Sequence, residues 1–129
     1  MAIVEVERTG DGIAVVTLND PDRRNTMTPA MGDALQATFG ELAQDPDLRV
    51  AVITGAGRAF SGGGDLEMLE EHASRAREGV DATAAMRGFY SRFLALRELP
   101  VPVIAAVEGY ALAGGFEHGD GSWVRVAGN

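Results

Sequence analysis

The stretch that decides the fold reads VAVITGAGRAFSGGGDL and spans residues 50–66. Its first part is a continuous apolar run, which is typical of a strand buried on both faces of a parallel sheet. Glycines follow at once, and Asp65 then stands where it can cap a short helix containing Leu66, Met68 and Leu69. The pattern therefore predicts a buried strand that runs through a glycine turn into a helix.

A second stretch of the same design reads VIAAVEGYALAGGFE and spans residues 103–117. Glycine lets the backbone approach a ligand closely, and the start of a helix leaves N–H groups unpaired and partly positive. Two such turns that face one another would aim two N–H groups at one oxygen. That arrangement is an oxyanion hole, which stabilises negative charge as it develops during a reaction.

The remaining pattern predicts an α/β protein with crossover helices, in the order β-β-α-β-α-α-β. Apolar periodicity and turn residues give strands at 2–8 and 13–18, a helix opened by Thr28 and Pro29, a strand at 48–54, a helix at 81–98 and a strand at 103–107. Residues 72–79 are predicted to be a mobile, charged connection. The glycines at 55–64 are predicted to form a loop.

The composition excludes several classes of function. The net charge of −8 argues against a nucleic-acid surface, which needs clustered positive charge. The apolar runs are too short to span a bilayer, and the N-terminus lacks the basic region of a signal peptide, so no membrane partner and a cytoplasmic location are expected. With no cysteine and only two histidines, the sequence predicts no metal site. The 129 residues suit one domain.

Three motifs together resemble the enoyl-CoA hydratase/isomerase (crotonase) family. AFSGGGDL at 59–66 resembles the family's A-F-x-x-G-x-D-L loop, and AAVEGYALAGGFE at 105–117 resembles its A-A-V-x-G-x-A-x-G-G-G-x-E segment. PDRRNTM at 21–27 is similar to its early P-x-x-x-N-A-L motif. The motifs occur in the family's order and spacing and cover nearly the whole chain.

The resemblance implies a crotonase-like ββα superhelix that binds an acyl-CoA thioester and hydrates 2-enoyl-CoA. The backbone N–H groups of Gly64 and Gly114 would form the oxyanion hole, and Glu117 matches one of the two carboxylates that activate water and deliver a proton. CoA would be held by Arg23 and Arg24 near its phosphates, and by Ser61, Gly62, Gly63, Asp65 and Leu66 along the pantetheine and adenine. No separate cofactor is implied, since coenzyme A is part of the substrate.

The chain departs from the family in length. Family members are roughly twice as long, so residues 1–129 resemble an incomplete acyl-CoA-binding domain, truncated before the second carboxylate and the C-terminal helical trimerisation region. A full-length member is expected to be a homotrimer or a dimer of trimers. A truncated, catalytically inactive relative or fragment that at most binds CoA is therefore the alternative function.

The segment after Glu117 also departs from the family. HGDGS at 118–122 stands where the family has an apolar helix, and two glycines and an aspartate disfavour a buried helix. One hypothesis is that these codons are read out of frame between two compensating indels. The other is an eroded, inactive relative.

Other interpretations of the same residues stay open. GAGRAF at 55–60 follows a strand, as a dinucleotide-binding fingerprint would, but Phe60 replaces the third glycine. Arg23 and Arg24 could also be solvated surface charges, and Asp65 could be only a helix cap. Glu117 could be an ordinary acid at a helix start, where the helix dipole favours negative charge. Acyl-chain length, and hydratase against isomerase chemistry, are not decided by the sequence.

Overall fold

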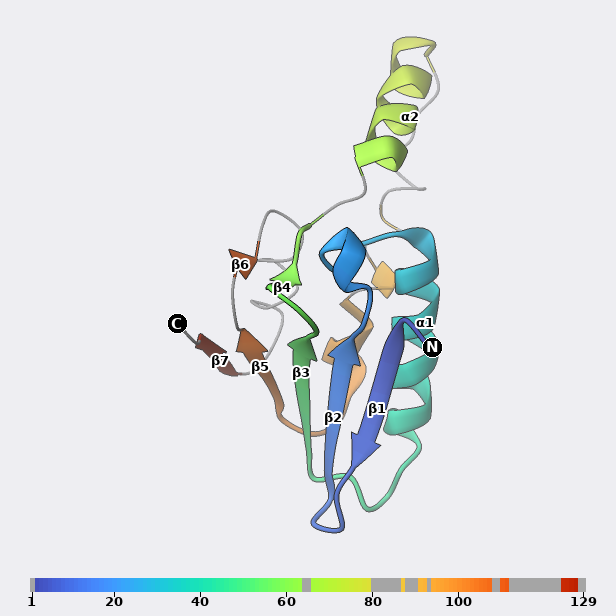
Figure 1. Cartoon of the computed structure of the whole chain (residues 1–129). Coiled ribbons are helices and arrows are strands. Elements are labelled where there is room, and N and C mark those ends of the chain that lie inside the picture. The colour runs from blue at the N-terminus through green and yellow to red at the C-terminus, as the bar shows by residue number, and fades with distance from the viewer. Residues whose placement is uncertain are drawn as a thin grey trace.

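A five-stranded sheet organises the chain, in the strand order β1-β2-β3-β5-β7 (Figure 1). The computed structural model describes residues 2–63, 66–79, 87, 91–92, 94–107, 110–111 and 124–127. The strands are β1 (Val4–Arg8), β2 (Ile13–Leu18), β3 (Val50–Gly55), β5 (Val103–Val107) and β7 (Val124–Ala127). β1 pairs antiparallel with β2, and the other neighbours are parallel.

A smaller sheet lies beyond the upper ends of β3 and β5 in Figure 1. It consists of β4 (Ala59–Ser61) and β6 (Tyr110–Ala111), which pair in parallel. β4 comes soon after β3 along the chain, and β6 comes soon after β5. The short sheet therefore continues the parallel order of the main sheet past its strand ends.

The helical elements are η1 (Pro21–Arg23), α1 (Pro29–Ala43), α2 (Leu66–Arg77) and η2 (Leu94–Glu98), of which η1 and η2 are 3₁₀ helices. α1 begins where the sequence predicts. Thr28 Oγ accepts a hydrogen bond from the N–H of Met31 at 3.1 Å, and Pro29 occupies the first turn, where its missing N–H costs nothing.

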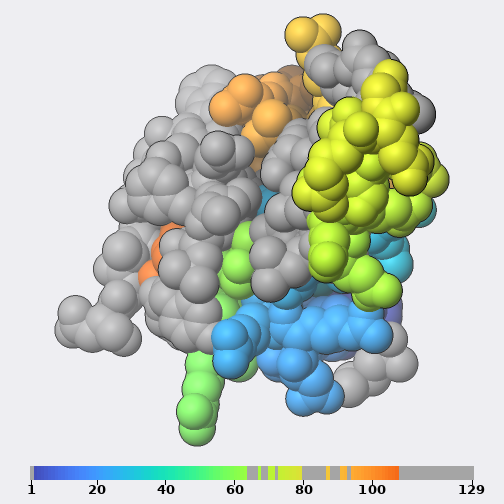
Figure 2. Space-filling model, turned by 90° about the horizontal axis from the view of Figure 1, so that it is seen from above, coloured from blue at the N-terminus to red at the C-terminus, as the bar shows by residue number. Residues whose placement is uncertain are grey.

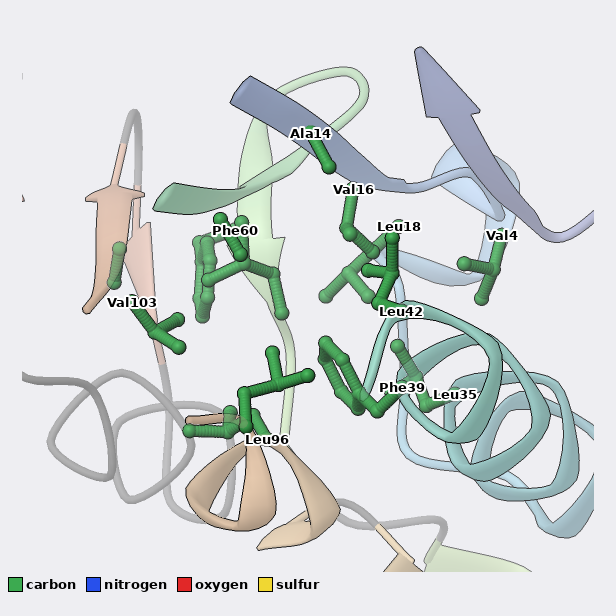
Figure 3. Packing of buried hydrophobic residues seen from close by; sticks show 14 of the residues in the cluster. Val4, Ala14, Val16, Leu18, Leu35, Phe39, Leu42, Phe60, Leu96 and Val103 are labelled. Atoms are coloured by element: carbon green, nitrogen blue, oxygen red, sulfur yellow. The ribbon is translucent and has the colours of Figure 1, made fainter. Parts of the chain in front are cut away.

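The core lies between one face of the sheet and the two helices α1 and η2 (Figure 3). Along β2 the even-numbered residues Ala14, Val16 and Leu18 are buried, as period-two alternation requires. Phe39 of α1 and Leu96 of η2 face this side of the sheet and are also buried. Burying one such Leu, Phe or Val side chain contributes about 1.5–3 kcal/mol, so the core fixes α1 on the sheet and with it the strand ends.

Most of the predicted strands are confirmed, including β2 and β5 with the predicted limits. The prediction of a mobile connection at 72–79 is wrong for its first part, because α2 continues to Arg77. Glu, Ala and Arg are good helix formers, and Arg75 pairs with Glu71 one turn away. The helix ends before Gly79, whose φ of +87° only glycine adopts readily.

Two other predictions differ from the structure in detail. The helix expected at 81–98 ends as the 3₁₀ helix η2, with residues 87, 91 and 92 helical; residues 80–86, 88–90 and 93 lie outside the described residues. The segment 55–64, which was expected to be a loop, contains the strand β4. The local pattern of apolar and polar residues could not reveal this strand, because its partner β6 lies far along the sequence. Within the described part of the chain, no helix is long and apolar enough to cross a bilayer.

Candidate functional site

The predicted site motifs meet at one edge of the sheet. β2, β3 and β5 run parallel, so their C-terminal ends lie together, and the segments that leave them begin at the same edge. Figure 2 looks down on this edge and shows the blue segment after β2 at the molecular surface. In open α/β sheets ligands bind outside the carboxyl ends of the strands, so this edge is the expected place for a site.

The pairing of β4 with β6 brings together two short strands, one from each glycine-rich motif. Ala59 lies opposite Tyr110, and Ser61 lies opposite Ala111. Gly64 is the third residue after Ser61, and Gly114 is the third after Ala111. Each predicted donor therefore stands three residues along the chain from a member of the pair Ser61 and Ala111.

Asn25 holds the segment after β2 against the turn after β3. Its side chain is fully buried, and Nδ2 donates to the carbonyls of Ala56 at 2.9 Å and Ala59 at 3.0 Å. Oδ1 accepts from the N–H of Asp20 at 2.7 Å. Asn25 has a φ of +52°, in the left-handed region that asparagine tolerates better than most residues. One amide thus satisfies three main-chain groups that would otherwise be unpaired.

Ser61 links the same two segments from the other side. Its side chain is fully buried; Oγ donates to the carbonyl of Asn25 at 2.8 Å and accepts from the N–H of Gly63 at 3.2 Å. Main-chain bonds complete the link, from the N–H of Gly62 to Arg24 O and from the N–H of Met27 to Gly63 O, both at 2.7 Å. The Ser61 hydroxyl therefore faces the protein, and a CoA contact at this residue stays a prediction for its main chain.

Close approach of the backbone requires glycine at position 55 of this edge and leaves little room for a Cβ at position 62. A Cβ at Gly55 would lie 2.5 Å from Phe60 O and 2.6 Å from Ala59 O, which are both backbone atoms. At Gly62 a Cβ would meet Arg24 Cβ and Arg24 O at 3.3 Å. The glycines of the first motif therefore let the turn fold back on itself and on the Arg24 segment.

Positive charge gathers around this packed turn. Arg23 ends η1 and Arg24 comes next with a φ of +56°; both side chains are exposed, and neither pairs with a carboxylate among the described residues. Arg58 is also exposed, and it adjoins Gly57, where a Cβ would lie 2.9 Å from Pro21 Cβ of η1. Arg58 was not predicted from sequence, although its place directly before the AF of the loop motif was a usable signal.

Several predicted site residues lie outside the described residues: Gly64, Asp65, Gly114, Glu117 and the 118–122 segment. Their roles stay predictions. Leu66 is the first residue of α2, and Gly62 and Gly63 belong to the turn that packs on the Arg24 segment. Among the described residues, no group of three or more His, Asp or Glu is placed to hold a metal ion.

The element after β3 disfavours the dinucleotide-binding interpretation. A G-x-G-x-x-G fingerprint opens directly into a helix whose N-terminus receives the pyrophosphate. Here Ala59–Ser61 form the strand β4, and between β3 and Leu66 the described residues contain no helix. The GAGRAF segment therefore lacks the helix that the fingerprint needs.

The comparisons with known proteins agree with this geometry. A profile of the enoyl-CoA hydratase/isomerase family matches residues 8–122. A probable enoyl-CoA hydratase of Mycobacterium tuberculosis is 39% identical over 116 residues, which are 90% of this chain and 43% of that protein. An enoyl-CoA hydratase/carnithine racemase from Magnetospirillum magneticum matches in structure with a TM-score of 0.81 and 32% identity, over 98% of this chain and 46% of that chain.

A monofunctional enoyl-CoA isomerase from M. smegmatis is also similar, with a TM-score of 0.76 and 34% identity over 98% of this chain and 50% of that chain. The chain thus spans about half the length of the relatives it matches. Over that length it has the mixed α/β sheet of the crotonase fold. The chain belongs to the enoyl-CoA hydratase/isomerase family.

Proposed function

We propose that this chain binds an acyl-CoA thioester and holds its carbonyl oxygen between the backbone N–H groups of Gly64 and Gly114. The observation that carries the proposal is the parallel pairing of β4 with β6, which sets Ser61 opposite Ala111. Gly64 is the third residue after Ser61, and Gly114 is likewise the third residue after Ala111. Two donors on separate turns converge on one oxygen only if the turns are neighbours, and the pairing of the strands β4 and β6 supports that arrangement.

The chemistry that this pair of donors serves is formation of an enolate. Hydration of a 2-enoyl-CoA adds the oxygen of water to C3 and a proton to C2, and negative charge develops on the thioester oxygen in between. Fixed N–H donors stabilise that charge more than they stabilise the ground-state carbonyl, which lowers the barrier. Glu117 is proposed as one of two carboxylates that exchange protons with water and with C2.

The coenzyme part of the substrate would lie over the exposed arginines. Arg23, Arg24 and Arg58 place positive charge beside the glycine turn in a chain whose net charge is −8, and CoA phosphates need such local charge. Main-chain groups of residues 61–66 would lie along the pantetheine. The reaction then needs no cofactor of its own, since coenzyme A arrives as part of the substrate.

A matched pair of ligands tests carbonyl recognition directly. Butyryl-CoA is a thioester, and S-butyl-CoA is the corresponding thioether, which lacks only the carbonyl oxygen. Calorimetric titration of the chain is expected to give roughly thirtyfold tighter binding of the thioester, because two hydrogen bonds of about 1 kcal/mol each are at stake. Equal affinities for the two ligands would remove the basis for an oxyanion hole.

Arginine variants separate the coenzyme contacts from the carbonyl contacts. Arg23→Ala and Arg24→Ala should weaken both ligands by the same factor, since both carry the same phosphates, and the loss should shrink as salt is added. Arg8→Ala is the matched control, because Arg8 lies at the opposite end of the sheet. A loss confined to the thioester would contradict the assignment of these arginines to the phosphates.

The alternative function, a relative that at most binds CoA, is separated by an activity assay. Loss of the conjugated enoyl-thioester absorbance of crotonyl-CoA reports hydration, and Glu117→Gln should abolish it without abolishing thioester binding. Binding without hydration by the 129-residue chain would favour the non-catalytic alternative. For the whole enzyme we propose a homotrimer or dimer of trimers, which sedimentation of the full-length protein would test.

A further inference from the structure

The polar main-chain groups just before the predicted donor Gly64 are bonded within the protein. The N–H of Gly62 donates to Arg24 O at 2.7 Å, and the N–H of Gly63 donates to Ser61 Oγ at 3.2 Å. The carbonyl of Gly63 accepts from the N–H of Met27 at 2.7 Å. Neither of these two glycine N–H groups is free to bind a substrate carbonyl, so the turn can offer a donor only beyond Gly63.

We propose that Ser61 is a positioning residue, which fixes the direction in which the next main-chain N–H points. A trans peptide group is planar, and its N–H points opposite to its carbonyl. The carbonyl of Gly63 accepts from the N–H of Met27. We infer from peptide planarity that the other side of this peptide group, where the predicted donor stands, is turned away from the 24–27 segment. This proposal rests on the proposed function, in which that N–H binds the thioester oxygen.

Ser61 is the side chain that holds this peptide group in place. Its hydroxyl bridges the Asn25 carbonyl and the Gly63 N–H, one on each of the two segments, and it is fully buried. Gly63 has a φ of +92°, so its neighbouring peptide groups would rotate easily without a restraint. An oxyanion donor is useful only within about 2.7–3.1 Å of the charged oxygen, so a small rotation of this peptide group reduces its effect.

The decisive variant is Ser61→Ala, assayed with butyryl-CoA and S-butyl-CoA. Loss of the bridge should reduce the preference for the thioester from roughly thirtyfold to roughly fivefold, because the Gly64 donor is no longer held in line with the carbonyl oxygen while the proposed Gly114 donor remains. Affinity for the thioether should stay unchanged, because that ligand has no carbonyl. A merely structural role would weaken both ligands together.

Thr54→Val is the matched control variant. Thr54 Oγ also donates to a main-chain carbonyl, that of Ala106 at 3.1 Å, but this bond joins β3 to β5 within the main sheet and does not involve the 24–27 segment or Gly63. The variant therefore removes a comparable hydrogen bond and should leave the thioester preference intact. If Thr54→Val lowers the preference as much as Ser61→Ala does, the effect is a general loss of stability and the proposal is overturned.

Amide hydrogen exchange gives a second readout that does not depend on a ligand. Ser61→Ala should speed exchange at Gly63 and Met27 while leaving amides in β2 protected. Where Ser61→Ala does not fold, Ser61→Cys carries the test, since a thiol fills similar space but is a weak donor and acceptor. Unchanged exchange at Gly63 in either variant would overturn the bridge.

The outcomes separate the two proposals. A wild-type chain that binds thioester and thioether equally overturns the oxyanion function, and the positioning role with it. A wild-type chain that prefers the thioester, together with a Ser61→Ala variant that keeps the full preference, overturns the positioning role alone. A preference reduced in Ser61→Ala and kept in Thr54→Val supports both.

Discussion

The two edges of the sheet are both rich in polar interactions, but they differ in burial. At the C-terminal edge, Asn25 and Ser61 are fully buried and bond to main-chain groups. At the opposite edge, Arg8 pairs with Asp45, and the N–H of Asp47 donates to Asp45 Oδ1 at 2.9 Å. Half of the Arg8 side chain is exposed to solvent there.

The difference shows why a site belongs on the first edge. A buried polar group left without a partner costs about 1–3 kcal/mol, so a buried network permits one arrangement and resists others. An exposed pair exchanges its partners for water at little cost and contributes at most about 1 kcal/mol. N–H donors that must keep a fixed direction therefore need the support of a buried polar network. Substitutions at the two edges should therefore differ in their cost, from the largest effect at Gly55 to the smallest at Arg8.

Gly55→Ala should be the most damaging change. Its Cβ would lie 2.5 Å from Phe60 O, and two backbone carbonyls would have to move to admit it. We expect a loss of about 3 kcal/mol or more in the free energy of unfolding, measured by urea denaturation. Gly10→Ala in the hairpin turn is the control, because a Cβ there meets nothing within 4 Å. Similar stabilities of the two variants would mean that the backbone of the turn after β3 can shift to admit a Cβ at little cost in free energy.

Asn25→Ala should destabilise the chain by about 2–3 kcal/mol, because three main-chain groups lose a hydrogen-bond partner, one of them buried and two part-buried. Part of the loss is conformational, since alanine resists the φ of +52°. Asn25→Gly removes that part, and it should be about 1 kcal/mol more stable than Asn25→Ala in the same denaturation experiment. An Asn25→Ala chain as stable as wild type would show that the amide network is dispensable.

Thr28→Ala should cost about 1 kcal/mol through loss of the N-cap of α1. Thermal unfolding followed by circular dichroism measures the change. Thr28→Ser keeps a hydroxyl that accepts from the N–H of Met31, so it should recover most of the loss. Equal effects of the two substitutions would assign the loss to the methyl group and its packing, and not to the cap.

The ion pair between Arg8 and Asp45 should contribute least. A double-mutant cycle with Arg8→Ala and Asp45→Ala is expected to give a coupling energy of about 0.5 kcal/mol, which falls further in high salt. The measurement is urea denaturation of the four chains. A coupling energy larger than the stability loss of Asn25→Ala would mean that the interactions at the Arg8 edge stabilise the chain more than those at the C-terminal edge.

Local rules were enough for much of the fold. β2 is predicted by period-two alternation, and the start of α1 is predicted by Thr28 and Pro29, because both signals act between residues near in sequence. The extent of α2 was missed, since its charged residues fit a solvated helix as well as a connection. β4 was missed because its partner β6 lies far along the chain, and no short-range pattern encodes such a pairing.

The candidate site divides in the same way. The glycine motifs, Arg23 and Arg24 were predicted from sequence, and their contacts with CoA stay predictions. The exposed Arg58 beside them was not predicted, and neither was the inward direction of the Ser61 hydroxyl. A motif gives the type and spacing of residues and not the side to which each side chain turns. That direction depends on which main-chain groups are left unpaired by the surrounding packing.

By itself, then, the sequence determined the α/β class, the buried strands, the start of α1 and the glycine turn after β3, because apolar period, capping residues and glycine act locally. Only the tertiary structure decided that β4 pairs with β6, and that Asn25 and Ser61 tie the segment after β2 to the turn after β3. Those contacts join residues more than thirty positions apart in the chain. They form only when the core has already brought the parallel strand ends together, since the buried polar groups must then find their partners in one another.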